Sequence, residues 1–128
     1  VDTPGFQGML RLLAEGRCWV KLSGAYRNSA LGHPYADTLP FVQTLVRTNP
    51  EQLVWGTDWP HPSVRVMPND GDLVGLVPLW LPNEALREQV LVRNPANERQ
   101  VVVRSCAHSD AKVIANIAAT AYGEGKVK

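Results

Sequence analysis

Apolar residues recur at helical spacing in some segments of the chain and form short continuous runs in others. Helical spacing predicts helices over residues 6–13 and 39–46, and apolar runs predict strands over residues 18–22 and 53–57. Gly16 is expected to follow the first helix, because glycine favours the left-handed conformation found just past a helix end. A helical crossover joins the two strands, which predicts that they are adjacent and parallel.

Polar segments and further helical patterns follow the strands. A polar loop is expected after the first strand, over residues 25–34, and a longer one after the second, over residues 58–72. The remaining predicted elements are two helices, a third strand and a last helix: residues 73–81, 84–92, 100–104 and 113–121. The alternation of strands and helices predicts an α/β fold.

Three signals mark the ends of these helices. Asn83 is expected to cap the helix over residues 84–92, and Asn94-Pro95 is expected to end it. Asp70 and Asp72 are expected to form a turn and the beginning of a helix, with no role in chemistry.

Composition narrows the classes of protein further. The 128 residues carry 13 Lys and Arg against 12 Asp and Glu, for a formal net charge of +1, and 45% are hydrophobic. This is typical of one globular domain and gives no electrostatic case for a nucleic acid or an anionic membrane as partner. The apolar stretches fall short of the roughly 20 residues that a membrane span needs.

Cysteine content and the N-terminus bear on location and completeness. Cys18 and Cys106 are too few for a disulfide framework, and neither lies in a paired Cys/His zinc motif. A reducing, cytoplasmic setting is therefore expected. The N-terminus lacks the pattern of a signal peptide and begins at Val1 without a methionine, which suggests that the chain is a piece of something longer.

Asp58 is the strongest candidate for a catalytic residue. It directly follows the second predicted strand in LVWGTDWPHP, and parallel α/β sheets bind ligands at the carboxyl ends of their strands. Trp55 and Trp59 would make its surroundings partly apolar, and desolvation would raise the basicity of the carboxylate. The alternative is that Asp58 only caps the loop in a packing corner of Trp and Pro.

Residues after the first predicted strand would open onto the same rim. Arg27 would clamp a substrate carboxylate through two parallel N–H bonds, or lie solvated in its loop. Tyr26 would line a pocket or simply pack. His61, three residues after Asp58, would be a hydrogen-bond donor, a proton shuttle or a supporting partner, or have a purely structural role.

Three segments together carry a family resemblance: CWVKLSGAYR, PFVQTLVRTNPEQLVWGTDWPHP and MPNDGDLVGLVPLWLPNEALREQVLVRNPA. They resemble the C-terminal portion of the amidohydrolase-related (amidohydrolase 2) family of (β/α)8-barrel hydrolases, and most closely its 2-pyrone-4,6-dicarboxylate lactonase branch. The resemblance implies a partial TIM barrel in which residues 18–22 and 53–57 belong to strands seven and eight. It further implies that Asp58 matches the catalytic aspartate and that Arg27 matches a residue that binds substrate carboxylate.

The chain also departs from the family pattern. A full barrel needs about 250 residues, and neither the His-x-His motif of the first strand nor the histidine expected before strand seven is present. We therefore divide the chain into the C-terminal part of a barrel domain, residues 1–96, and an unassigned strand-helix tail, residues 97–128.

The resemblance implies hydrolysis of a small carboxylated lactone or a related cyclic compound. Asp58 would be the general base that activates water. The substrate-binding residues would be Arg27, His61 and Tyr26, and His61 would also support the site through a hydrogen bond. The wider superfamily often uses a divalent metal, but no metal ligands or cofactor are expected in this chain.

Two other classes of function stay open from the sequence. One is a catalytically inactive barrel fragment that packs on a partner chain, and the other is a module that binds carboxylates without turnover. Because a partial barrel leaves strand edges unpaired, self-association is expected unless the tail covers an edge. The isolated chain is expected to have little or no activity.

Overall fold

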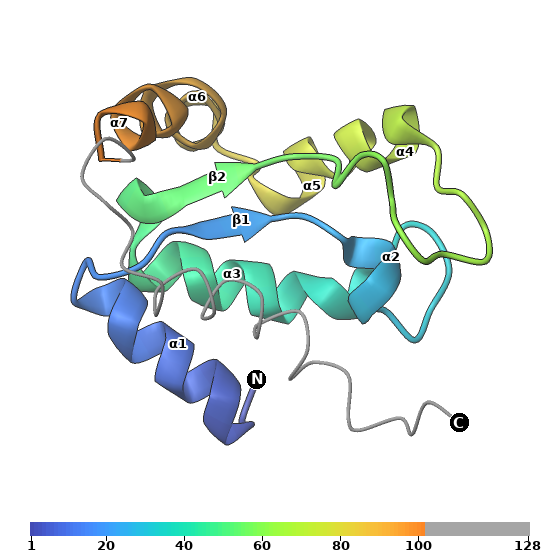
Figure 1. Ribbon diagram of the computed structural model, residues 1–128, viewed down its shortest axis with the longest axis horizontal. Coiled ribbons are helices and arrows are strands. Elements are labelled where there is room, and N and C mark those ends of the chain that lie inside the picture. The colour runs from blue at the N-terminus through green and yellow to red at the C-terminus, as the bar shows by residue number, and fades with distance from the viewer. Residues whose placement is uncertain (102–128) are drawn as a thin grey trace.

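A pair of parallel strands lies at the centre of the molecule (Figure 1). The computed structural model describes the backbone of residues 1–101 and the side chains of residues 1–97. Strand β1 (Val20–Leu22) pairs in parallel with β2 (Leu53–Trp55), with Val20 opposite Leu53 and Leu22 opposite Trp55. The predicted adjacent, parallel pairing is confirmed. Both strands are shorter than the apolar runs that predicted them.

Helices α1 (Pro4–Ala14) and α3 (Leu39–Thr48) lie on one side of the strand pair in Figure 1. Both carry a proline in their first turn, where no backbone donor is lost from the helix. Gly16 has a φ of 70°, and its N–H donates to the carbonyl of Leu13, so the predicted glycine end of the first helix is confirmed.

The remaining elements are short and follow the strand ends. Helix α2 (Ala25–Asn28) lies within the segment expected to be only loop. The others are the 3-10 turns η1 (Ala36–Thr38) and η2 (Pro50–Gln52), helices α4 (Asp70–Gly75), α5 (Val77–Trp80) and α6 (Glu84–Glu88), the π-helical turn η3 (Gln89–Arg93), and α7 (Asn94–Val101). Asn83 caps α6 by accepting from the Leu86 N–H at 3.1 Å, as predicted.

The core lies between the strands and the helices that flank them. Its fully buried side chains come from elements far apart in the sequence: Leu13, Leu53, Leu76, Leu81 and Val90. In β1, Val20 and Leu22 are buried while Lys21 between them is exposed, because successive side chains of a strand point to opposite faces. One face of β1 therefore packs on helices, and Lys21 marks its open face.

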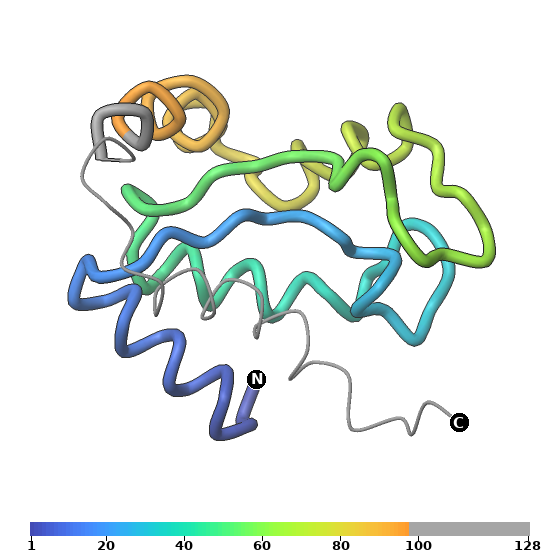
Figure 2. Tube along the Cα trace, viewed as in Figure 1, coloured from blue at the N-terminus to red at the C-terminus, as the bar shows by residue number. Residues whose placement is uncertain are grey.

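The prediction that Asn94-Pro95 ends a helix is wrong. The chain passes from α6 through η3 into α7 as one continuous helical trace (Figure 2). Asn94 is buried, and its Nδ2 donates to the carbonyls of Pro50 at 2.8 Å and Leu53 at 2.6 Å. A proline ring inside a helix collides with the carbonyl four residues earlier, and the wider π-helical turn lies where that collision would occur.

The C-terminal predictions are tested only at their beginning. Residues 100 and 101 are helical, so the strand predicted over residues 100–104 is wrong at its first two positions. The rest of that strand and the helix predicted over residues 113–121 lie outside the described residues. Among the helices that are described, none has the length and apolar character needed to cross a membrane.

Candidate functional site

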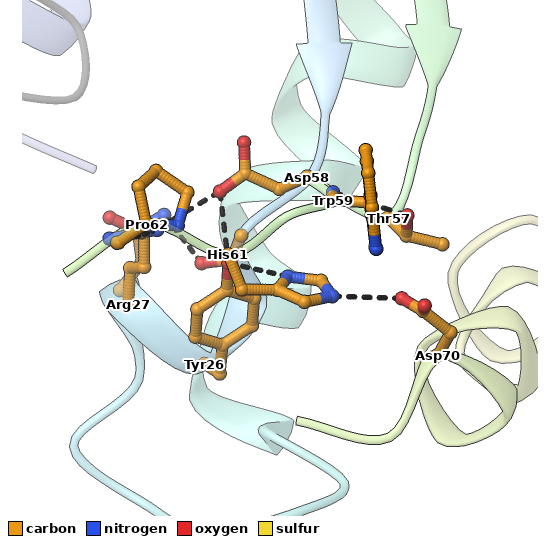
Figure 3. Close-up of polar contacts among 10 residues, drawn as sticks. Tyr26, Arg27, Thr57, Asp58, Trp59, His61, Pro62 and Asp70 are labelled. Carbon is orange, nitrogen blue, oxygen red and sulfur yellow. Dashed lines mark hydrogen bonds and ion pairs between the residues drawn. The ribbon is translucent and has the colours of Figure 1, made fainter. Parts of the chain in front are cut away.

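The carboxyl ends of the two strands bring the predicted site residues together (Figure 3). Asp58 follows β2 by three residues, while Tyr26 and Arg27 lie in α2, just after β1. Gly24 precedes α2 with a φ of 67°, in the left-handed region where glycine carries no side-chain penalty. The chain therefore turns directly into α2 and carries both side chains over the end of β2.

Asp58 is held by two neighbours on one of its carboxylate oxygens. Its Oδ2 accepts a hydrogen bond from the Tyr26 hydroxyl at 2.9 Å and another from Arg27 Nε at 2.9 Å. Figure 3 shows the second carboxylate oxygen directed away from both donors. The carboxylate thus has one anchored oxygen and one oxygen turned outward.

Arg27 contacts Pro62 and the Tyr26 ring as well as Asp58. Besides Asp58, it donates from Nη2 to the Pro62 carbonyl at 2.6 Å, and its guanidinium carbon lies 5.1 Å from the centre of the Tyr26 ring. The expected clamp on a substrate carboxylate is therefore partly occupied by Asp58. The Arg27 and Asp58 side chains are 20% and 29% exposed, so the pair is largely shielded from solvent.

The expectation that Asp58 is a carboxylate of raised basicity is wrong. Burial alone raises the pKa of Asp58, but hydrogen bonds from Tyr26 and Arg27 and the positive charges of Arg27 and Lys21 outweigh burial and lower it. Burial and the hydrogen bond to Asp58 in turn raise the pKa of Tyr26, which keeps its proton. Asp58 is therefore an ionised, well-oriented carboxylate.

His61 lies beneath this pair and is 3% exposed. Its Nδ1 is 3.0 Å from the Tyr26 hydroxyl, and its Nε2 is 2.9 Å from Asp70 Oδ1. The loop that carries it folds back sharply, because Asp58 and His61 both have positive φ, 71° and 54°, and the His61 N–H donates to the Asp58 carbonyl at 2.8 Å. Both predicted site residues of this loop therefore converge on Tyr26.

Two further residues of the site were missed from the sequence. Asp70 begins α4, as expected, but it also reaches His61. Lys21 lies on the open face of β1 and contributes positive charge at Asp58. The alternation of apolar and charged residues in WVKL would have placed Lys21 on that face, whereas nothing in the spacing of Asp70 distinguishes it from a helix-capping acid.

Two cavities lie near the strand ends. One of about 10 Å³, with Ser23, Gly24 and Thr57 among its lining residues, lies at the carboxyl ends, and it is the size of one water molecule. A wider one of about 310 Å³ lies at the opposite ends, next to Trp19 and Gln52. The wider cavity therefore lies away from Tyr26, Arg27, Asp58 and His61, and the smaller one at their end of the strands holds no more than a water molecule.

The donor set in the described residues does not fit a divalent cation. One oxygen of Asp58 is bound to the positively charged Arg27, and both ring nitrogens of His61 are in contact with neighbours. No group of three or more His, Cys, Asp or Glu side chains is gathered to hold a metal among these residues.

A parallel strand pair with a charged site at its carboxyl ends defines an α/β protein of the kind that includes TIM barrels. The family model of the amidohydrolases matches residues 1–97. The chain belongs to this amidohydrolase family. The assignment of β1 and β2 to barrel strands seven and eight, and the division of the chain at residue 96, stay predictions.

Several relatives are named as enzymes of lactones. The chain is 43% identical over 99 residues to a 4-sulfomuconolactone hydrolase of Hydrogenophaga intermedia and 42% identical over 97 residues to a D-galactarolactone isomerase of Agrobacterium fabrum. These alignments cover 75% and 73% of this chain and 33% of each relative. A 2-pyrone-4,6-dicarboxylate hydrolase of Comamonas testosteroni is 36% identical over 105 residues, 74% of this chain and 34% of the relative.

A solved structure supports the fold. An apo crystal structure of an Agrobacterium tumefaciens protein matches with a TM-score of 0.64 and 42% identity, over 75% of this chain and 35% of the other. The chain thus spans about a third of the length of the relatives that it matches.

Proposed function

We propose that the protein carrying this chain hydrolyses a small carboxylated lactone, with Asp58 as the general base. The observation that carries the proposal is the ionised Asp58 carboxylate at the end of β2, anchored through one oxygen and turned outward through the other. Membership of the amidohydrolase family, with relatives named as lactone hydrolases, supports the substrate class.

The outward oxygen of Asp58 is suited to accept a proton from water. The water oxygen attacks the lactone carbonyl carbon as its proton passes to Asp58, and a tetrahedral intermediate forms. The ring C–O bond then breaks, and Asp58 returns the proton to the leaving oxygen. The product is an open-chain molecule with a new hydroxyl and a new carboxylic acid, and the acid then loses the second proton of the water to solvent. A carboxylate of lowered pKa is a weak base, so its contribution depends on orientation more than on basicity.

Arg27 has two roles in this proposal. It keeps Asp58 ionised through Nε, and it offers its remaining N–H groups to a substrate carboxylate. A guanidinium has five N–H groups, and the recorded bonds to Asp58 and Pro62 use two of them. Tyr26 borders the same space and contacts the substrate ring.

Lactone isomerisation is the second candidate, and the resemblance to a D-galactarolactone isomerase favours it. The same base would then take its proton from a hydroxyl group of the substrate instead of from water. Attack of that hydroxyl oxygen on the carbonyl closes a new ring as the old C–O bond breaks, and Asp58 returns the proton to the oxygen that leaves. The two reactions differ in product, since hydrolysis leaves an open hydroxy acid and isomerisation leaves a lactone.

The test is an assay of the full-length protein with pyrone, muconolactone and sugar-acid lactones, with products identified by NMR. Asp58→Asn should lower kcat and kcat/KM together by about 10²-fold or more, the value of a lost general base. Asp2→Asn, at an exposed position, is the matched control.

Each remaining result selects one alternative. Turnover that survives Asp58→Asn would overturn the mechanism. Binding of a dicarboxylate by calorimetry without any turnover would favour the carboxylate-binding module, and neither binding nor turnover would favour the inactive fragment.

A further inference from the structure

The row of contacts from Asp58 to Asp70 needs more hydrogens than the Tyr26 hydroxyl and a neutral His61 ring supply together. Three links connect four side chains: Asp58 to Tyr26 at 2.9 Å, Tyr26 to His61 at 3.0 Å and His61 to Asp70 at 2.9 Å. Each link needs one hydrogen. Two ionised carboxylates supply none, the tyrosine hydroxyl supplies one, and a neutral imidazole supplies one.

The direction of the first link decides the others. Asp58 is paired with the Arg27 guanidinium and accepts through Oδ2, so the single hydroxyl hydrogen of Tyr26 points at Asp58. The oxygen of Tyr26 is then the acceptor for His61, and Nδ1 must carry a hydrogen. Asp70 accepts at the other end, so Nε2 must carry one as well.

Two other placements of the third hydrogen fit the surroundings less well. On Asp58 it would lie on the oxygen that also faces Arg27, where a positive charge favours the ionised form. On Asp70 it would neutralise a side chain that is 48% exposed and that water can solvate as an anion. The ionisable groups facing the His61 ring are Tyr26 from α2 and Asp70 from α4, and Asp58 and Arg27 lie beyond Tyr26.

We propose that His61 is doubly protonated and that the Asp70 carboxylate stabilises this form of the ring. Because Nδ1 then donates to the Tyr26 oxygen, the Tyr26 hydroxyl can only donate to Asp58. Asp70 and His61 are thus positioning residues, because they act on the carboxylate through Tyr26. The T-shaped contact of the Tyr26 and His61 rings, with centres 5.4 Å apart and planes at 80°, holds this geometry. The catalytic consequence rests on the proposed function, whereas the protonation state does not.

The first test reads the ring nitrogens directly. ¹⁵N NMR of the 128-residue chain at neutral pH should show His61 with both nitrogens protonated, and solid-state spectra would report the same nuclei if the chain self-associates. His61→Gln identifies the signal among the three histidines, and His33→Gln, at an exposed position, is the matched control. One protonated and one bare nitrogen in the unaltered chain would overturn the proposal.

Two variants test the direction of the links. Tyr26→Phe removes the acceptor for Nδ1, so His61 should change to a neutral ring with only Nε2 protonated. Asp70→Asn keeps an acceptor for Nε2 but removes the negative charge, and it should also yield a neutral ring. A His61 ring that stays doubly protonated in both variants would contradict the assigned roles.

The second test is kinetic and uses the full-length protein. Asp70→Asn should lower kcat on the order of tenfold to a hundredfold, the value of one charge-assisted hydrogen bond, with little change in KM. Asp70→Glu should recover part of the loss, and Asp72→Asn on the same helix is the control that should leave kcat unchanged. An unchanged kcat in Asp70→Asn would refute the positioning role. Doubly protonated His61 in a protein without lactone turnover would instead refute only the proposed function.

Discussion

The side chains around Asp58 determine the pKa of its carboxylate more than its burial does, since their net effect is to lower it. The sequence predicted that Tyr26, Arg27, Asp58 and His61 would meet, because the ends of parallel strands share one rim. It could not predict which side chains pair, since pairing depends on reach and direction across the rim. Arg27 was expected to face a substrate, and in the structure its Nε instead lies 2.9 Å from Asp58.

At the residue scale, the lowered pKa of Asp58 makes stability depend on pH. The folded state favours the ionised carboxylate, so the stabilisation is present above the ordinary value of 3.8 and is lost as pH falls through the lower folded pKa. Asp58→Asn should therefore flatten this acid limb of the unfolding free energy, measured by urea denaturation across a pH series. Asp2→Asn is the control. An equally steep acid limb in Asp58→Asn would show that other groups cause the loss.

Replacing Arg27 separates its two roles. Arg27→Gln removes the positive charge beside Asp58, so the pKa of Asp58 should rise, as followed by ¹³C NMR of the carboxyl carbon. In the full-length protein, KM for carboxylated lactones should also rise, because the bidentate fork is lost. Arg27→Lys restores the charge without the fork, so it should recover the pKa but not KM. Recovery of both by lysine would contradict a bidentate contact with substrate.

At the element scale, the chain pattern predicted the order of elements better than their ends. Strands were found within residues 18–22 and 53–57, but only three residues of each run pair with the other strand. The helix end at Asn94-Pro95 was misplaced because proline usually stops helices, and here a π-helical turn precedes it. The buried hydrogen bonds of Asn94, which join that helix to the segment before β2 and to β2 itself, have no sequence signature.

Asn94 offers a test of this junction. Asn94→Ala leaves the carbonyls of Pro50 and Leu53 without their donor, so the free energy of unfolding should fall by about 1–3 kcal/mol. Chemical denaturation measures the change, and Asn97→Ala, at an exposed position one turn further on, is the control. A loss no greater than that of the control would mean that the junction is held by apolar packing alone.

At the scale of the whole molecule, the described sheet has two strands and therefore two edges. Large apolar side chains are also exposed, among them Trp59 at 75%, Val66 at 82% and Met67 at 65%. We expect the 128-residue chain to self-associate in a concentration-dependent way, because strand edges and apolar surface favour pairing with other copies.

Light scattering coupled to size exclusion, over a dilution series, measures this association. The full-length protein is the comparison, since it should show weaker dependence on concentration. A 128-residue chain that stays monomeric at every concentration would contradict the prediction.

Side-chain hydrogen bonds of nearly equal sequence separation join the chain segments at both ends of the parallel strand pair. Tyr26 and Arg27 meet Asp58 across 32 and 31 residues, while Asn49 and Gln52 bond the carbonyls of Leu13 and Gly16 across 36 residues each. The four contacts close overlapping loops that share residues 27–49, so forming one of them lowers the entropy of closure that the others still cost. The candidate active site and the far end of the strands should therefore form together during folding. A substitution at Asn49 would then loosen Asp58 from the opposite end of the molecule.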